Sequence, residues 1–514
     1  MSMSGHRRSR PSSDDASPSG RSPCHHTSMP TTTKHKDTHV PTGHHRRRFK
    51  RSSCSSSMDS PPPASRRPSW VILNLAGARR DAFPGDHRTT SSASALTSNG
   101  DKVSVSFELV APPGTSVLCL EGPQGPGPMS STRPDVIAAH RDVVLLKMSR
   151  RFGGGGDPVD YFVYQGSTGG AGDPSSLSLL PLHYHEELGF GGKPRQCLLS
   201  KDSTGIMSCC RDDREGSSSS FVVAKLSMTR EAADSPPAIN VHVFRSGSGE
   251  WEAFKNLHVR GANGGRDLNF WHTDAVVPYG RGRFLIWVDY YRGMIVADML
   301  SLPESEKKNQ PPPPPRLRYV PLPVDTVGDP DDYAYHGRGC PANSRSVCGT
   351  RYGIKFVSVD SKHCSNWGVG HANVLTWNHT FRITTWSLRE DDYYTWRKDV
   401  TMYEEEFWDD ALGSEKRFPR VTPEYPVVSM ENPDAVCFRL KKNLYRYDEP
   451  TWMVEVDLRK KILLGATAYS EEGSLYGYEH TINSARIYSS DISISTELPR
   501  YLDSTGQTYK RRRS

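Results

Sequence analysis

The chain has 514 residues, of which 35% are hydrophobic, and its net charge of +7 is unevenly distributed. Residues 1–68 carry 13 basic and four acidic side chains, and Lys510 to Arg513 add a second basic cluster. Between these tails 48 basic residues stand against 54 acidic ones, which excludes a uniformly basic nucleic-acid-binding domain. The longest uncharged apolar run, Trp70–Ala78, is too short to span a membrane.

Residues 1–68 are predicted to be a disordered basic tail, because they contain almost no aromatic or β-branched residues that could form a core. A dense basic cluster within the tail is a candidate nuclear-import signal or phosphate-binding arm, and it consists of Arg46, Arg47, Arg48, Lys50 and Arg51. The alternatives are a solvated tail that carries no targeting signal and an organellar transit peptide. Residues 501–514 form the basic C-terminal tail.

Residues 69–500 show mainly the alternation of a β protein. The alternation is clear in Val103–Leu109, Asn240–Phe244 and Trp452–Leu458, each of which is predicted to be a strand with one buried face. The continuous apolar run Phe284–Val288 predicts a strand buried on both faces. Long amphipathic helices are scarce, and Asp135–Met148 fits either a short helix or a strand-turn-strand.

Short turns separate several of these strands. Ser246–Gly249 and Tyr290–Gly293 are predicted hairpin turns in which glycine supplies a positive φ. The plan of strand, tight turn and strand recurs in Ile239–Phe254, Arg283–Leu300 and Asp434–Tyr469, which favours a β-propeller-like fold of repeated antiparallel sheets. Six or seven blades would need roughly 60–70 residues each, above the usual 40–50. Glycine- and proline-rich inserts would fill the difference, and a pair of β-sandwiches is the alternative.

The sequence contains none of the local patterns of nucleophile-elbow hydrolases, P-loop proteins or HExxH metalloproteases. Five potential zinc ligands fall within 32 residues, but their spacing is long and irregular, and they are Cys340, Cys348, His363, Cys364 and His371. Adjacent acidic pairs such as Asp331-Asp332 are poor acid–base partners, because neighbours on a strand point to opposite faces. We therefore predict no catalytic residue, no metal and no cofactor.

Aromatic residues beside two predicted hairpins are the candidate partner-binding residues. Exposed tryptophan, tyrosine and arginine side chains are typical anchors of protein interfaces, although such aromatics also fill cores. The candidates are Trp287, Asp289, Tyr290, Tyr291 and Arg292 at the first hairpin, and Tyr393, Tyr394 and Trp396 near the second.

Several strings between Trp70 and Tyr469 resemble a plant family that is abundant in grasses, "domain of unknown function 1618". The most specific is Gly282–Met294, and others begin at Ala138, Asp160 and Pro423. The resemblance implies a propeller similar to the regions attached to plant F-box proteins, and it brings no known activity or site residues. No F-box-like helical segment is evident in this sequence.

The sequence therefore favours a non-enzymatic module that binds an unknown protein partner on a β scaffold. One alternative is a hydrolase whose site is assembled from several loops, since such sites leave no local motif. Another is contact with nucleic acid through the basic tail. Scattered cysteines and the absence of a secretory signal predict an intracellular protein, nuclear or cytoplasmic, with an organellar location as the alternative.

Overall fold

The computed structural model describes residues 67–79, 92–122, 133–149, 159–167, 174–188, 192–209, 220–230, 235–263, 266–299, 313–324, 339–361, 381–389, 394–413, 417–442, 450–469 and 493–502. All of them belong to one compact unit that begins at Ser65. The predicted import cluster at residues 46–51, most of the N-terminal tail and residues 503–514 lie outside the described residues.

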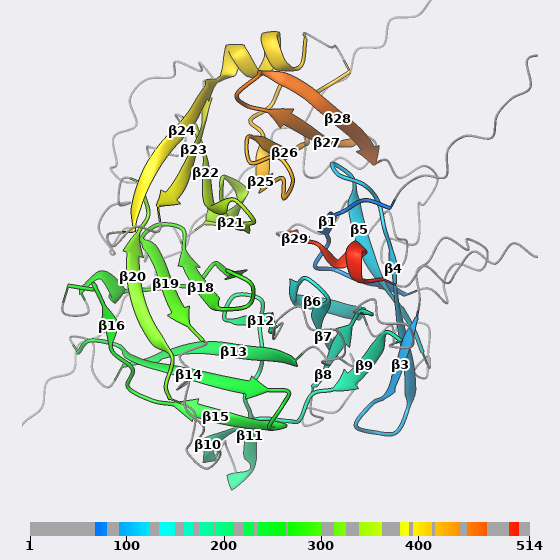
Figure 1. The fold of residues 1–514 in the computed structure, drawn as a ribbon, viewed down its shortest axis with the longest axis vertical. Coiled ribbons are helices and arrows are strands. Elements are labelled where there is room, and N and C mark those ends of the chain that lie inside the picture. Colours follow the sequence, from blue (N-terminus) through cyan, green and yellow to red (C-terminus); the bar gives the residue numbers. More distant parts are fainter. Residues whose placement is uncertain are drawn as a thin grey trace, which may run out of the picture. The chain divides into compact units, whose positions relative to one another are not determined.

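Six sheets, whose strands are mainly antiparallel, are arranged as the blades of a β-propeller, seen along its axis in Figure 1. Five of them begin with their innermost strand and step outward along the chain. The first contains β6 (Arg133–His140), β7 (Val143–Ser149), β8 (Asp160–Gln165) and β9 (Ser176–Leu179), and the second contains β12 (Thr204–Cys209), β13 (Ser220–Thr229), β14 (Ala238–Arg245) and β15 (Glu250–Phe254).

The next three blades follow the same plan. The third contains β17 (Ala275–Tyr279), β18 (Phe284–Asp289), β19 (Gly293–Asp298) and β20 (Arg316–Pro321), with β16 (Val259–Arg260) added in parallel at its outer edge. The fourth contains β21 (Arg345–Thr350), β22 (Gly353–Ser361), β23 (Phe381–Arg389) and β24 (Thr395–Tyr403), and the fifth contains β25 (Glu424–Val428), β26 (Ala435–Leu440), β27 (Thr451–Asp457) and β28 (Ile462–Tyr469).

The sixth blade joins the two ends of the described chain. It contains β1 (Val71–Leu73), β2 (Ala78–Arg79), β3 (Ala93–Leu96), β4 (Lys102–Glu108), β5 (Thr115–Glu121) and the C-terminal β29 (Ile494–Thr496). Strand β29 pairs antiparallel with β1, which pairs in parallel with β5. The inner strands β6, β12, β17, β21, β25 and β29 contact one another in turn, and β29 contacts β6, so the ring is closed.

Small elements complete the description. Strands β10 (Tyr184–Leu188) and β11 (Pro194–Gln196) form a separate two-stranded sheet. The described residues include three 3-10 turns, η2 (Arg266–Leu268), η3 (Pro341–Asn343) and η6 (Leu498–Tyr501), and a short π-helix, η5 (Glu406–Ala411). No helix of the described residues is long and apolar enough to cross a membrane.

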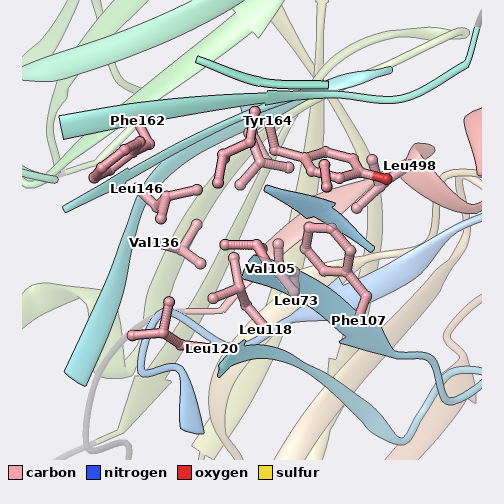
Figure 2. Close-up of a cluster of buried hydrophobic side chains, with 14 of the residues drawn as sticks. Leu73, Val105, Phe107, Leu118, Leu120, Val136, Leu146, Phe162, Tyr164 and Leu498 are labelled. Carbon is pink, nitrogen blue, oxygen red and sulfur yellow. The ribbon is translucent and has the colours of Figure 1, made fainter. Parts of the chain in front are cut away.

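The hydrophobic core is divided into layers between neighbouring blades. The layer between the sixth and first blades contains Phe107, Tyr164 and Leu498 (Figure 2). Leu498 comes from η6, so the C-terminal segment is anchored in the same layer as the first strands of the propeller. The ends are also joined by hydrogen bonds, because Arg67 Nη1 donates to the Leu502 carbonyl at 2.7 Å and Arg500 Nε donates to the Ser69 carbonyl at 3.1 Å.

The structure confirms the predicted strand signals and the propeller class. In β18, Leu285 and Trp287 pack into one layer while Ile286 and Val288 pack into the next, so the apolar run is buried on both faces as expected. The ambiguous segment Asp135–Met148 forms strand, turn and strand in β6 and β7. The alternative of a pair of β-sandwiches is wrong, because the sheets form a ring of six blades.

Both predicted hairpin turns form, but one prediction about glycine was wrong. Gly249 has φ +71° in the β14–β15 turn, as expected. Gly293 does not adopt a positive φ. A Cβ atom there would lie 2.6 Å from the Val320 carbonyl oxygen, so close approach of β20 is the reason for glycine.

Candidate functional site

The first group of predicted partner-binding residues lies largely inside the propeller. Trp287 is completely buried in the layer next to the second blade, and its Nε1 donates to the Ser203 carbonyl at 2.8 Å. Tyr290 is buried in the opposite layer, where its hydroxyl accepts the Val347 N–H at 3.3 Å. Burial raises the pKa of Tyr290. These two aromatics connect neighbouring blades.

Asp289 organises the β18–β19 turn from a fully buried position. Its carboxylate accepts the N–H groups of His272 and Tyr291, each at 3.0 Å, and the Arg292 guanidinium at 3.3 Å. Tyr291 and Arg292 are half-buried, and the Arg345 guanidinium lies 5.5 Å from the centroid of the Tyr291 ring. The role of Tyr291 and Arg292 in binding a partner stays a prediction.

The second predicted group joins the same interblade layer as Tyr290. Tyr394 and Trp396 are half-buried and pack against that layer. Trp396 Nε1 donates to the Pro321 carbonyl at 2.8 Å, and the Arg318 guanidinium lies 4.8 Å from the Tyr394 ring centroid. The fold therefore places Tyr290 and the second group in the same interblade layer. Tyr393 lies outside the described residues.

A different site emerges in the middle of the ring. A cavity of about 370 Å³ is lined by five of the inner strands, β6, β17, β21, β25 and β29, and by the η6 segment. Its volume lies near the lower end of the range typical of ligand pockets, about 300–1,000 Å³. Much of the wall is apolar and is supplied by Val277, Val347, Val427, Val428 and Ile494.

Arginine follows three of the inner strands where they turn into the second strand of their blade. These residues are Arg141 after β6, Arg281 after β17 and Arg351 after β21, and all three line the cavity. Because the inner strands of a propeller occupy equivalent positions in successive blades, their turns emerge at one end of the ring. Arg500 of η6 also lines the cavity. We call this end of the cavity, with its four arginines, the arginine mouth.

The turn that contains Arg281 is held tightly against the neighbouring blade. Gly282 has φ +80°, and a Cβ atom there would lie 2.1 Å from the Ser208 carbonyl oxygen at the end of β12. Ser208 in turn donates its N–H to His140 Nδ1 at 3.1 Å. His140, Ser208 and Gly282 thus connect the ends of β6, β12 and β17, and Arg281 is presented from a fixed turn.

Two of the four arginines already have partners in the protein. Arg141 Nε donates to the Tyr501 hydroxyl at 3.0 Å, and its guanidinium lies 5.7 Å from the Tyr501 ring centroid. Arg500 pairs with Glu497 at 3.0 Å. Arg281 and Arg351 are exposed, and neither forms an ion pair with a described residue.

The groups in the cavity that could do acid–base or nucleophilic chemistry have structural roles. Burial, followed by the charge of Arg141, lowers the pKa of His140 to about 3, so its imidazole is neutral and accepts the Ser208 N–H. Burial raises the pKa of the Cys348 thiol, whose Sγ lies 3.2 Å from Ser495 Oγ. A thiol is a weak nucleophile until it is deprotonated.

The cysteine–histidine cluster noted in the sequence is only partly described. Cys340 is exposed and Cys348 is buried, while His363, Cys364 and His371 lie outside the described residues. Within the described ranges, no three histidine, cysteine or acidic side chains are placed to hold a metal ion.

The arginine mouth was not predicted from the sequence. The signal was present as an arginine within two residues of the end of each of three inner strands, in His140-Arg141, Gly280-Arg281 and Thr350-Arg351. Each is an ordinary hairpin turn by itself. Their convergence depends on which strands are innermost, which only the ring reveals.

The family model described as "Protein of unknown function (DUF1618)" matches residues 287–437. No curated protein matches the chain. Among solved structures, the α-L-arabinofuranosidase Arb93A from Fusarium graminearum is 12% identical, with 72% of this chain and 92% of that chain covered and a TM-score of 0.24. Sqt1 from Chaetomium thermophilum is 11% identical, with coverage of 78% and 88% and a TM-score of 0.28. The family match supports the resemblance found in the sequence, over β18 to β26.

Proposed function

We propose that this protein is a non-enzymatic interaction module that binds a protein partner at the arginine mouth. The observation that supports this most is the central cavity, which combines an apolar wall with exposed arginines at one end. Arginine and tyrosine are enriched at protein interfaces, where apolar cores are surrounded by polar rims. A closed ring of sheets gives such a surface a rigid support.

The chemistry of the cavity favours binding over catalysis. Acid–base catalysis needs a group that can exchange a proton near the working pH, and paired carboxylates provide this when their pKa values are separated. Among the described lining residues, Glu497 is the one carboxylate, and it is paired with Arg500. His140 is neutral and acts as a hydrogen-bond acceptor.

The rim around the mouth provides further contact surface. Tyr352 follows Arg351 in the β21–β22 turn and is 54% exposed. Its hydroxyl donates to the Glu431 carbonyl at 3.0 Å, which ties this turn to the loop after β25. A partner could place one or two side chains in the cavity and rest its backbone on these turns.

The proposal can be tested by site-specific photo-crosslinking of the full chain in an extract of the source organism. Benzoylphenylalanine would replace Tyr352 at the mouth or Tyr403 at the end of β24, because the two tyrosines are equally exposed at 54%. We expect one discrete protein adduct from position 352 and none of that protein from position 403. Adduct formation at position 403 alone, or equal labelling at both positions, would overturn the proposed binding face.

A further inference from the structure

We propose that the arginine mouth recognises an acidic peptide segment of the partner. In this arrangement, carboxylates bind Arg281 and Arg351 while an apolar side chain enters the cavity between them and the inner strands. The inference rests on the proposed function and specifies the chemistry of the partner.

The β17–β18 turn separates two arginines into different roles. Arg283 is bound to Asp298 at 2.7 Å, and its guanidinium lies 4.8 Å from the Phe284 ring centroid. Arg281, two residues earlier, lines the cavity and has no ion pair within the described part of the chain. The left-handed conformations of Gly280, Arg281 and Gly282 produce this tight turn, with φ values of +69°, +52° and +80°.

Arg351 occupies the corresponding place in the next blade. Its guanidinium lies 5.0 Å from the Tyr352 ring centroid. Stacking of this kind holds a guanidinium by its face and leaves the N–H groups along its edge free to bind a carboxylate. Strands β17 and β21 approach closely, since a Cβ atom on Gly349 would lie 2.7 Å from the Pro278 carbonyl oxygen. The two arginines are therefore presented from adjacent turns.

Two carboxylates near the mouth already have partners in the protein. Glu497 pairs with Arg500, and the Glu431 carboxylate accepts a hydrogen bond from Ser69 Oγ. The mouth consequently carries excess positive charge, although acidic residues outnumber basic ones between the two tails. Arginine–carboxylate pairs are strong when the geometry allows two parallel hydrogen bonds, so an anionic ligand suits this charge.

The wall of the cavity favours a peptide over a nucleic acid. Valines from β17, β21 and β25 and Ile494 from β29 line the space behind the arginines. Phosphates and sugars would leave this apolar surface without a partner, whereas an acidic peptide can carry leucine, valine or phenylalanine between its carboxylates. Burial of such a side chain adds stabilisation in proportion to the apolar area removed from water.

The test uses the full chain and two pools of fluorescein-labelled octapeptides. One pool alternates aspartate or glutamate with apolar residues, and the matched pool has asparagine or glutamine at the acidic positions. We expect the acidic pool to bind at least tenfold more tightly in fluorescence anisotropy, because charge-assisted hydrogen bonds contribute more than neutral ones. The affinity should fall as salt is raised.

Four variants locate the binding. R281Q and R351Q should each weaken binding of the acidic pool by about threefold to tenfold. R283Q and R420Q remove the same charge from arginines that are paired with Asp298 and Asp409, so they should change the affinity less than twofold. Each variant is compared at equal fraction folded, measured by circular dichroism.

Three results would overturn the inference. They are equal binding of the acidic and amide pools, equal effects of R281Q and R283Q, and tighter binding of a single-stranded oligonucleotide that is lost in R281Q and R351Q. None of these results affects the protein adduct expected at position 352, which tests the proposed function. The proposed binding face can therefore be correct even if the ligand is not an acidic peptide. Conversely, loss of that adduct with retained peptide selectivity would reject the proposed function alone.

Discussion

Replacing Gly282 by alanine tests whether the turn that carries Arg281 is held by the neighbouring blade. Two costs arise from the structure. The left-handed φ of +80° costs a residue with a Cβ about 1 kcal/mol. The added Cβ would also lie 2.1 Å from the Ser208 carbonyl oxygen, and relief of such overpacking costs about 1–3 kcal/mol. We therefore expect G282A to lose about 2–4 kcal/mol of unfolding free energy.

Gly249 provides a matched control on a hairpin turn of the second blade. Its φ is +71°, but no atom lies within 4 Å of the position that a Cβ would occupy. The variant G249A should therefore show only the conformational cost of about 1 kcal/mol. The difference between the two variants isolates the contact between β12 and the β17–β18 turn.

Equilibrium urea unfolding of both variants, followed by tryptophan fluorescence, measures this difference. Acidic-pool binding under native conditions gives a second readout, since G282A should displace Arg281 and weaken binding while G249A should not. If the two variants lose the same stability within 0.5 kcal/mol and bind the peptides equally, the close contact at Ser208 and its role in placing Arg281 are wrong.

Three further predictions concern the cavity wall, a buried ion pair and the closing segment. Because the pKa of His140 is lowered to about 3 in the fold, the unfolded chain takes up the proton first as pH falls below 6.5, so stability is lost between pH 6.5 and 3. The imidazole lines the cavity and is partly exposed. The variant H140N keeps a hydrogen-bond acceptor but does not titrate. Between pH 7 and pH 5 its unfolding free energy, measured in urea titrations, should therefore fall by about 1–2 kcal/mol less than that of the original chain. The variant K355M removes the 2.8 Å partner of the nearly buried Asp399 carboxylate, while Arg397 at 3.1 Å remains. It should cost about 1–3 kcal/mol of unfolding free energy by the same assay, and an unchanged stability would contradict this. L498A should cost about 2–5 kcal/mol of unfolding free energy, because it opens a cavity in the layer between the sixth and first blades. The control L464A changes a side chain that is 45% exposed on β28 and should cost less than about 1 kcal/mol. Equal Tm shifts for the two variants would refute the role of η6 in closing the ring.

Local patterns were sufficient to predict strands but not their places in the ring. Alternation in Val103–Leu109 and the continuous run in Phe284–Val288 reflect which faces of a strand are buried, and this follows from side-chain period alone. The number of blades depends on pairings between distant segments, such as Val71 with Thr496. Loops of uneven length obscure the repeat, so its period gave no firm count.

The aromatic hairpins show that residue type alone does not distinguish a buried aromatic side chain from an exposed one. Trp287 and Tyr290 have the residue types of interface anchors, yet both are buried between blades, since large aromatics fill the layers that separate tapered sheets. Arg281 and Arg351 give no sequence signal of a site, because each lies in an ordinary hairpin turn. Their proximity results from adjacent inner strands whose turns are about 70 residues apart in the sequence.

Amide hydrogen exchange of the full chain, with and without the partner recovered by crosslinking, tests the proposed binding face most directly. Binding at the arginine mouth predicts slower exchange in the turns at residues 280–283 and 351–353 and in η6, with no change in the outer strand β28. Slower exchange confined to β28 or to other outer strands, with the three mouth segments unchanged, would contradict the account.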